Sequence, residues 1–311
     1  MTTRKLILSA VMAIALFQTA LVFAQADTPV NNDPAWVYYE KGKYEMRQKE
    51  YGNAVYYFKQ ALSVARIMPE AELALGEVYF YEGDYRLAEQ QYLRALEQKA
   101  AFSVPDMNYT VLYHLADLYE IWLKYGKMYE VLKTIVNDDT AFNDKKYALF
   151  RTNTVTLYEN KGFDKMFTYN RLEETFSTEA HGRLAWYLYR TWNFETARDY
   201  ALYSVIPILT ECMLEIRRDG NDYRYTTLDD FFKTALAIDR VREYLEEKKI
   251  YERIYYLALI SYEIIPLRDN GRSLLRILAS LPEAETIQAR AAGQLQNYRR
   301  EARIDTRTIE K

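Results

Sequence analysis

The side chains best suited to chemistry are few and widely spaced in this sequence. The chain has two histidines, His114 and His181, and one cysteine, Cys212. Neither histidine has the spacing of a metal site, such as two histidines four residues apart on one helix. The sequence also lacks the patterns of a thiol pair, a nucleophilic serine elbow and a phosphate-binding glycine loop. We therefore expect no enzyme, no metal and no cofactor, and expect both histidines to be packed or surface residues.

Carboxylates are the remaining candidates for catalysis, because a glycoside hydrolase needs only two of them. The chain has 44 Asp and Glu against 41 Lys and Arg, a formal net charge of −3. Such mixed charge is typical of solvated helix faces and predicts no nucleic-acid partner. A hydrolase acting on cell-wall material stays open as the third of three functions.

The first 26 residues have the layout of a secretory signal peptide. Arg4 and Lys5 precede an apolar run over 6–23, and Ala-Gln-Ala over 24–26 follows it directly. We expect cleavage after Ala26 and an exported, periplasmic or secreted protein without a lipid-attachment cysteine. The alternative is an uncleaved anchor, since about 18 apolar residues nearly span a bilayer. After cleavage no segment is apolar and long enough to cross a membrane, and the single Cys212 excludes an intramolecular disulfide.

The same small–large–small pattern occurs twice, 34 residues apart. Residues 49–63 read KEYGNAVYYFKQALS and residues 83–97 read GDYRLAEQQYLRALE. Ala88, Tyr92 and Ala95 are four and three residues apart, so they share one face of a helix. Small residues let a second helix approach closely, and the aromatic ring fills the space between the two. One such pair cannot bury its own apolar face, so pairs are expected to stack.

This pattern resembles the tetratricopeptide repeat (TPR), a helix–turn–helix unit of 34 residues. The resemblance implies an all-α, right-handed superhelical solenoid of TPR and TPR-like repeats. It is clearest over 35–68 and 69–102, and degenerate repeats are predicted over 108–139 and 178–211. A further helix pair without the repeat signature is expected over 144–175, split near Gly162.

Beyond the solenoid, the pattern fades. We predict a signal peptide over 1–26, a solenoid over 27–218, a C-terminal helical extension over 226–304 and a frayed tail over 305–311. Residues 228–264 are expected to form two amphipathic helices that break near Lys248–Lys249, with Pro266 ending the second.

In TPR proteins, the first helices of successive repeats line a concave groove. The resemblance therefore implies that solvent-facing residues on these helices bind the partner. Large aromatic residues beside arginine suit a protein or peptide ligand. The predicted groove residues are Trp36, Tyr39, Lys43, Arg47, Glu77, Phe80, Tyr81, Tyr113, Asp117, Glu120, Trp186, Tyr189 and Arg190.

The leading hypothesis is a non-catalytic exported scaffold that binds a protein or peptide of the cell envelope and helps to assemble a complex there. The alternative is a TPR protein that binds a small ligand and serves a solute-transport system. A deep enclosed cavity would favour the alternative, whereas an open groove would favour the scaffold.

Overall fold

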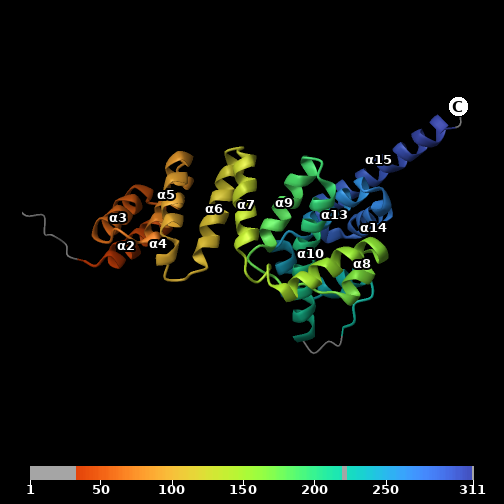
Figure 1. Cartoon of the computed structure of the whole chain (residues 1–311), viewed down its shortest axis with the longest axis horizontal. Coiled ribbons are helices and arrows are strands. Elements are labelled where there is room, and N and C mark those ends of the chain that lie inside the picture. Colours follow the sequence, from red (N-terminus) through yellow and green to blue (C-terminus); the bar gives the residue numbers. More distant parts are fainter. Residues whose placement is uncertain (1–32, 219–222, 310–311) are drawn as a thin grey trace, which may run out of the picture. The chain divides into compact units, whose positions relative to one another are not determined.

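The chain is all-helical wherever its structure is described. The computed structural model describes residues 33–218 and 223–309, and none of these residues forms a β-strand. The expected signal peptide, 1–26, lies outside them. The chain divides into two compact units, which we call unit 1 (up to Ser103) and unit 2 (from Val104) and describe separately (Figure 1). The predicted all-α class, built from helix–turn–helix pairs, is confirmed.

Unit 1 contains two antiparallel helix pairs and a final 3₁₀ turn. In each pair, a glycine on the first helix lies under an aromatic ring of the second. A Cβ at Gly42 would lie 2.6 Å from the ring of Phe58, and a Cβ at Gly76 would lie 2.6 Å from the ring of Tyr92. Both rings are fully buried. The elements are α2 (Ala35–Arg47), α3 (Tyr51–Val64), α4 (Pro69–Tyr81), α5 (Tyr85–Glu97) and η1 (Lys99–Ala101).

Unit 2 begins with two further helix pairs, and the second helix of one packs against the first helix of the next. These pairs are α6 (Met107–Ile121) with α7 (Tyr125–Asp138), and α9 (Thr178–Arg190) with α10 (Phe194–Arg218). α7 packs directly on α9, so the segment between them is an insertion into the stack of pairs.

The insertion is α8 (Lys145–Tyr169), which consists of two helical segments separated at Gly162, where the backbone is non-helical and φ is 78°. The predicted helix pair, split at Gly162, is therefore confirmed. It does not stack between α7 and α9, which contact each other directly, and it packs on α10. Asp139 holds both ends of the insertion: one carboxylate oxygen accepts the Phe142 amide (3.0 Å) and the other accepts the Ser177 amide (2.8 Å).

The C-terminal part of unit 2 begins with two short helices, α11 (Leu228–Ala235) and α12 (Asp239–Glu247). The predicted break near Lys248–Lys249 is present, but the expectation of two helices over 228–264 is wrong. A third helix arises because the chain also turns at 236–238. The remaining elements are α13 (Ile250–Glu263), η2 (Ile265–Leu267), α14 (Arg268–Ser280), η3 (Pro282–Ala284) and α15 (Glu285–Ile309).

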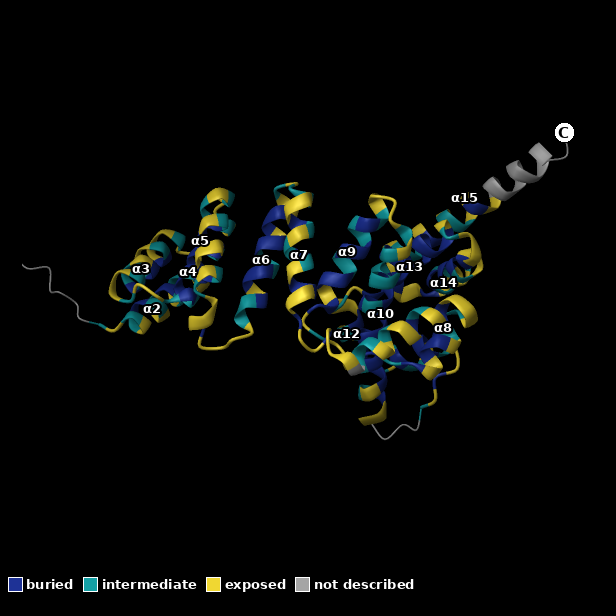
Figure 2. Cartoon of the chain, in the orientation of Figure 1, coloured by how far each residue is buried: buried dark blue, intermediate teal, exposed yellow. Residues whose placement is uncertain are grey.

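Helix pairing resumes with α13 and α14. Gly271 of α14 touches the backbone of α13: a Cβ there would lie 2.5 Å from the Ala258 carbonyl oxygen. α10 packs on α13, and α14 packs on α15. One continuous apolar core contains residues from α8 to α15, and most of α10 and α13 is buried in it (Figure 2).

α8 is tied into this core by polar contacts across long stretches of chain. The buried hydroxyls of Tyr158 and Ser261 form a hydrogen bond of 2.7 Å. The Asn270 side-chain amide donates to the Tyr158 carbonyl at 3.2 Å. These contacts join α8 to both helices of the α13–α14 pair.

The turns inside the first four pairs share one backbone geometry. The second residue after each first helix has a positive φ: Lys49, Gly83, Leu123 and Trp192. Each of these amides donates to the carbonyl three residues earlier, and the next amide donates five residues back, as in Lys124 to Tyr119 (2.7 Å). These bonds satisfy carbonyls that a helix end would otherwise leave unpaired.

Candidate functional site

The predicted groove residues are divided between the two units. Those of unit 1 lie on α2 and α4, and those of unit 2 lie on α6 and α9. All belong to first helices of pairs, as the repeat implies. Their partner-binding role stays a prediction.

In unit 1, Trp36 and Tyr81 are the most exposed predicted aromatics, at 62% and 58%. Tyr81 stacks on Tyr51, with ring centroids 6.0 Å apart. Phe80 is half-buried and contacts the rings of Tyr81 (5.9 Å) and Tyr85 (6.0 Å). The rings of Phe80 and Tyr81 therefore rest on neighbouring aromatics, which lowers the entropy cost of using them in binding.

Tyr39 and Lys43 lie together on α2. The ammonium of Lys43 is 5.2 Å from the ring centroid of Tyr39, within the range of a cation–π contact. Burial, together with the nearby carboxylates of Glu40, Glu70 and Glu77, raises the pKa of Tyr39 to about 12. Glu77 is half-buried on α4, and Arg47 is exposed at the end of α2.

In unit 2, Arg183 joins α9 to α6. Its guanidinium donates to Asp117 (2.7 Å) and to Glu120 (2.7 Å) through separate nitrogens. Tyr113 makes a second link, because its hydroxyl donates to the Phe176 carbonyl (2.5 Å) and accepts the Ala180 amide (3.1 Å). Burial raises the pKa of the Tyr113 hydroxyl. Tyr113 therefore positions α6 on α9 through its polar atom.

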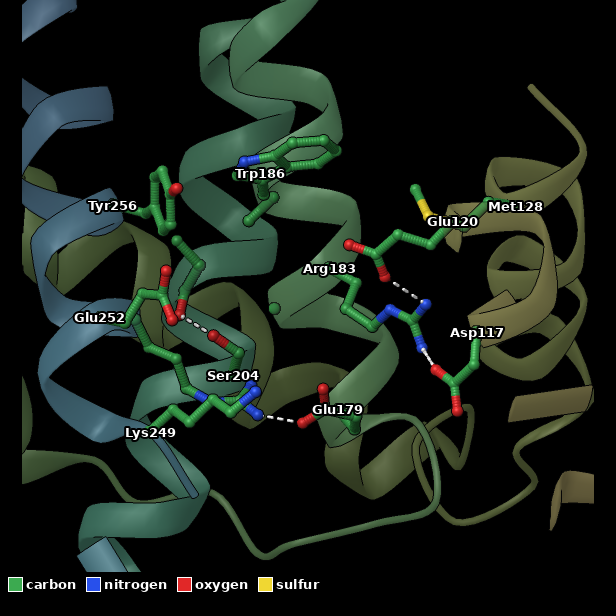
Figure 3. Close-up of a pocket in the computed structure, with 14 residues that line it drawn as sticks. Asp117, Glu120, Met128, Glu179, Arg183, Trp186, Ser204, Lys249, Glu252 and Tyr256 are labelled. Carbon is green, nitrogen blue, oxygen red and sulfur yellow. Dashed lines mark hydrogen bonds and ion pairs between the residues drawn. The ribbon is translucent and has the colours of Figure 1, made fainter. Parts of the chain in front are cut away.

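A cleft of about 270 Å³ opens over α9 and brings three of the predicted residues together: Asp117, Glu120 and Trp186 (Figure 3). Its other walls come from α7, α10 and the start of α13, including Met128, Ser204 and Tyr256. Trp186 is half-buried and is held between the ring of Tyr125 (5.7 Å) and the guanidinium of Arg190 (5.0 Å). Tyr189 lies outside the lining and packs between Phe194 (6.0 Å) and Tyr256 (6.5 Å).

Arg253 of α13 forms part of the cleft floor. It pairs with Glu179 of α9, and its Nε donates to the Lys248 carbonyl at 2.8 Å. Its Nη1 is buried and has no hydrogen-bond partner, and the same holds for Nε of Arg183. Arg253 fits there because α9 has no side chain at Gly182.

Exposure separates the two kinds of charge in the cleft. The side chains of Asp117, Glu120 and Glu179 are 51%, 48% and 52% exposed. Those of Arg183 and Arg253 are 15% and 10% exposed. The ion pairs therefore hold the arginines inward and leave carboxylate oxygens at the rim. Glu252 and the exposed Lys249 also line the cleft, so the rim has more carboxylates than ammonium groups.

No known protein-family profile matches the chain. An uncharacterized protein of Treponema pallidum (strain Nichols) is 23% identical over 249 residues, which cover 78% of this chain. The match spans 65% of that relative, less than two thirds of its length.

Two solved structures are similar over 82% of this chain. One is described as functional characterization of Pseudomonas aeruginosa pilF (15% identical, 97% of that chain, TM-score 0.39). The other is BtubC (BKLC) from P. vanneervenii (17% identical, 92% of that chain, TM-score 0.34). These values do not place this chain in a family.

The sequence did not predict most of the lining residues, among them Glu179, Arg183, Arg253 and Tyr256. The first two could have been found, because positions 179, 183, 186 and 190 share one face of a helix. Arg253 and Tyr256 come from a segment without the repeat signature, so nothing in the sequence places them beside α9.

The residues considered first for chemistry lie elsewhere. His181 and Cys212 are fully buried, and His114 is half-buried on α6. Over residues 33–218 and 223–309, no group of His, Cys, Asp and Glu could hold a metal ion. Across the same ranges, no helix is long and apolar enough to span a bilayer.

Proposed function

We propose that this chain is a non-catalytic scaffold that binds a protein or an extended peptide. One observation carries the proposal: residues expected from the sequence to face a partner, Asp117, Glu120 and Trp186, line one cleft. An aromatic wall supplies buried area at low entropic cost, and the carboxylates around it supply specificity.

The charges favour a partner segment that carries lysine or arginine. The rim carboxylates are about half exposed, whereas the arginines lie below them. The attraction would weaken with added salt, since exposed charges are screened.

We further propose that the chain works outside the cytoplasm and helps to assemble an envelope complex. This part depends on the N-terminal sequence, where an apolar run over 6–23 leads to Ala-Gln-Ala. Sequencing the N-terminus of protein purified from the native host tests it. A mature chain that starts at Asp27 supports export, and a chain that still carries the apolar run supports the anchor.

The scaffold is tested by crosslinking pull-down from envelope extracts, using wild type and a Trp186→Ala/Glu120→Gln variant. Tyr169→Ala is the matched control, because Tyr169 is 72% exposed on α8 and absent from the cleft lining. A recurrent protein captured by wild type and the control, and lost by the cleft variant, supports the proposal. Equal capture by all three chains contradicts the assignment of the cleft.

The peptide chemistry is tested with matched peptides that differ only in lysine or glutamate at the charged positions. We expect the lysine peptide to bind wild type more tightly, and the difference to shrink at high ionic strength. Tighter binding of the glutamate peptide would show that the buried arginines, and not the rim carboxylates, select the partner.

A small ligand is the second candidate function, and the unpartnered Nη1 of Arg253 favours it, because a carboxylate or carbonyl could accept from it. The cleft volume of about 270 Å³ lies just below the usual range for small-molecule sites, roughly 300–1,000 Å³. Native mass spectrometry of protein purified from its host separates the candidates. A retained small molecule that Trp186→Ala releases would favour the ligand-binding function.

The hydrolase hypothesis is the least supported. Asp117 and Glu120, two of the four carboxylates that line the cleft, bind the same guanidinium. This is an ion-pair network, whereas a glycoside hydrolase keeps a proton on one of its two carboxyl groups. Release of soluble fragments from purified cell wall by wild type, and its loss in Glu120→Gln, would reverse this ranking.

A further inference from the structure

Three turns of unit 2 each carry a large apolar side chain that points into solvent. Leu123 follows α6, Trp192 follows α9 and Ile265 follows α13. Their exposed fractions are 70%, 79% and 74%, among the highest of any large apolar residue in the described ranges. We call these three residues the tip residues.

The contacts between first helices place the tip residues along one edge. Going along α6 and α9, Tyr113 meets Ala180, and then Asp117 and Glu120 meet Arg183. Residue numbers rise together in these contacts, so α6 and α9 are parallel and end at the same side.

The same reasoning applies to α9 and α13. Glu179 pairs with Arg253, and the ring centroids of Tyr189 and Tyr256 are 6.5 Å apart. Residue numbers again rise together, so these two helices are parallel as well. All three first helices therefore end at one edge of unit 2. In Figure 1 the α6–α7 and α9–α10 turns are both at the upper end of their helix pairs.

The turn geometry does not require apolar residues at these positions. Leu123 and Trp192 have φ of 57° and 63°, a conformation unfavourable for residues with a Cβ. The equivalent positions in unit 1 hold Lys49 and Gly83, with φ of 63° and 81°. A backbone conformation that disfavours side chains thus carries leucine and tryptophan in unit 2, and both are left in water.

We propose that this edge of unit 2 rests on a lipid bilayer, with the tip residues inserted among the lipid headgroups and upper acyl chains. The tips are separate, because each stands on its own turn, and adjacent helices are about 8–10 Å apart. A protein partner needs a continuous patch of about 800 Å² on each side. A fluid bilayer accepts isolated side chains, and tryptophan prefers its interface.

The charged residues beside the tips are mixed in sign. One exposed cation lies within four residues of each tip and could contact lipid phosphates, but Glu120, Glu195, Glu263 and Asp269 lie equally close, so the edge has no net positive charge. Insertion of apolar groups is therefore expected to contribute more to binding than electrostatic attraction. The cations are Lys127, Arg190 and Arg268.

The experiment is vesicle flotation with the chain that starts at Asp27, which keeps every described helix and removes the apolar N-terminal run. The vesicles contain phosphatidylcholine with about a quarter of phosphatidylglycerol, an anionic lipid. The edge variant is Leu123→Asn/Trp192→Asn/Ile265→Ser, since asparagine tolerates positive φ. The control variant, Leu149→Ser/Tyr169→Ser/Leu214→Ser, removes three exposed apolar side chains of α8 and α10.

We expect wild type and the control to float with the vesicles. The edge variant should lose about tenfold or more in partitioning to the vesicles, because three apolar side chains that would insert into the bilayer are removed. The Trp192 emission, taken as the difference between wild type and Trp192→Phe, should shift to shorter wavelength when vesicles are added. Wild type that does not float, or an edge variant that floats like the control, would overturn the proposal. So would a wild-type dimer that the edge variant loses without any flotation, because the edge would then bind a second copy of the chain.

Discussion

Arg253 lies over the bare backbone of Gly182: a Cβ at residue 182 would be 2.3 Å from the Nη1 of Arg253. The absence of a side chain at this position of α9 is what allows α13 to place a guanidinium on the cleft floor. The pairing of Arg253 with Glu179 depends on the same space.

Gly182→Ala should therefore change the cleft more than it changes stability. Arg253 is long and can swing away, and alanine gains about 1 kcal/mol of helix propensity over glycine. We expect the free energy of unfolding to change by less than about 1 kcal/mol, while affinity for a cleft ligand changes several-fold. Denaturant unfolding and peptide titration measure the two effects. A large loss of stability with unchanged binding would show that Gly182 serves packing alone.

Gly76→Ala, in contrast, should lower the stability of the chain. Its new Cβ would lie 2.6 Å from the ring of Tyr92, which is fully buried between α4 and α5 and has no room to move. Overpacking of this kind costs about 1–3 kcal/mol. Urea unfolding should show this loss in unit 1, whereas Gly52→Ala, which meets nothing within 4 Å, is the control.

His181 should make the protein sensitive to acid. The imidazole is fully buried against Phe142, Tyr200 and Tyr203, and neither ring nitrogen has a hydrogen-bond partner. Burial lowers the pKa of His181 to about 3, although the carboxylate of Asp139 opposes this shift.

The direction in which pH changes the stability follows from proton uptake by the unfolded chain. Between about pH 6.5 and pH 3 the unfolded chain binds this proton and the folded chain does not, so stability falls as the pH drops through this window. The slope should approach about 1.4 kcal/mol per pH unit for this one group. His181→Phe should flatten the slope measured by denaturant unfolding at several pH values, and an unchanged slope would exclude His181 as its source.

Arg183→Met should increase the affinity of the cleft for cations. Methionine keeps an apolar stem between α6 and α9, while Asp117 and Glu120 lose their shared guanidinium. We expect a lysine peptide to bind about two- to fivefold more tightly, or ~0.4–1 kcal/mol, the size of an exposed ion pair. Titration at low salt measures this. Weaker binding by a variant that is folded normally would show that Arg183 itself contacts the partner.

The sequence predicts the helix pairs well where packing is local. Gly42 with Phe58 and Gly76 with Tyr92 are close along the chain, so each repeat contains both partners of its own contact. The same pattern indicated α9 and α10. The cleft residues Asp117, Glu120 and Trp186 followed from the repeat's geometry.

Long-range features could not be predicted in this way. The turn between α11 and α12 contains Leu236, Ala237 and Ile238, with neither glycine nor proline to mark it. Arg253 reaches the cleft only because α13 packs beside α9, 74 residues away from its partner Glu179. Such a contact depends on how the helices of unit 2 pack together, and a local sequence pattern does not contain this information.

The insertion of α8 also has a consequence for how unit 2 folds. In a simple repeat array each pair contacts only its neighbours, so folding can start anywhere and spread stepwise. Here the Tyr158–Ser261 bond joins residues 103 positions apart, and the Asn270–Tyr158 bond joins residues 112 apart. Contacts between such distant residues slow folding, because a long loop must close before they form. Unit 2 should therefore fold slowly and unfold as one block, with uniform hydrogen-exchange protection from α8 to α14.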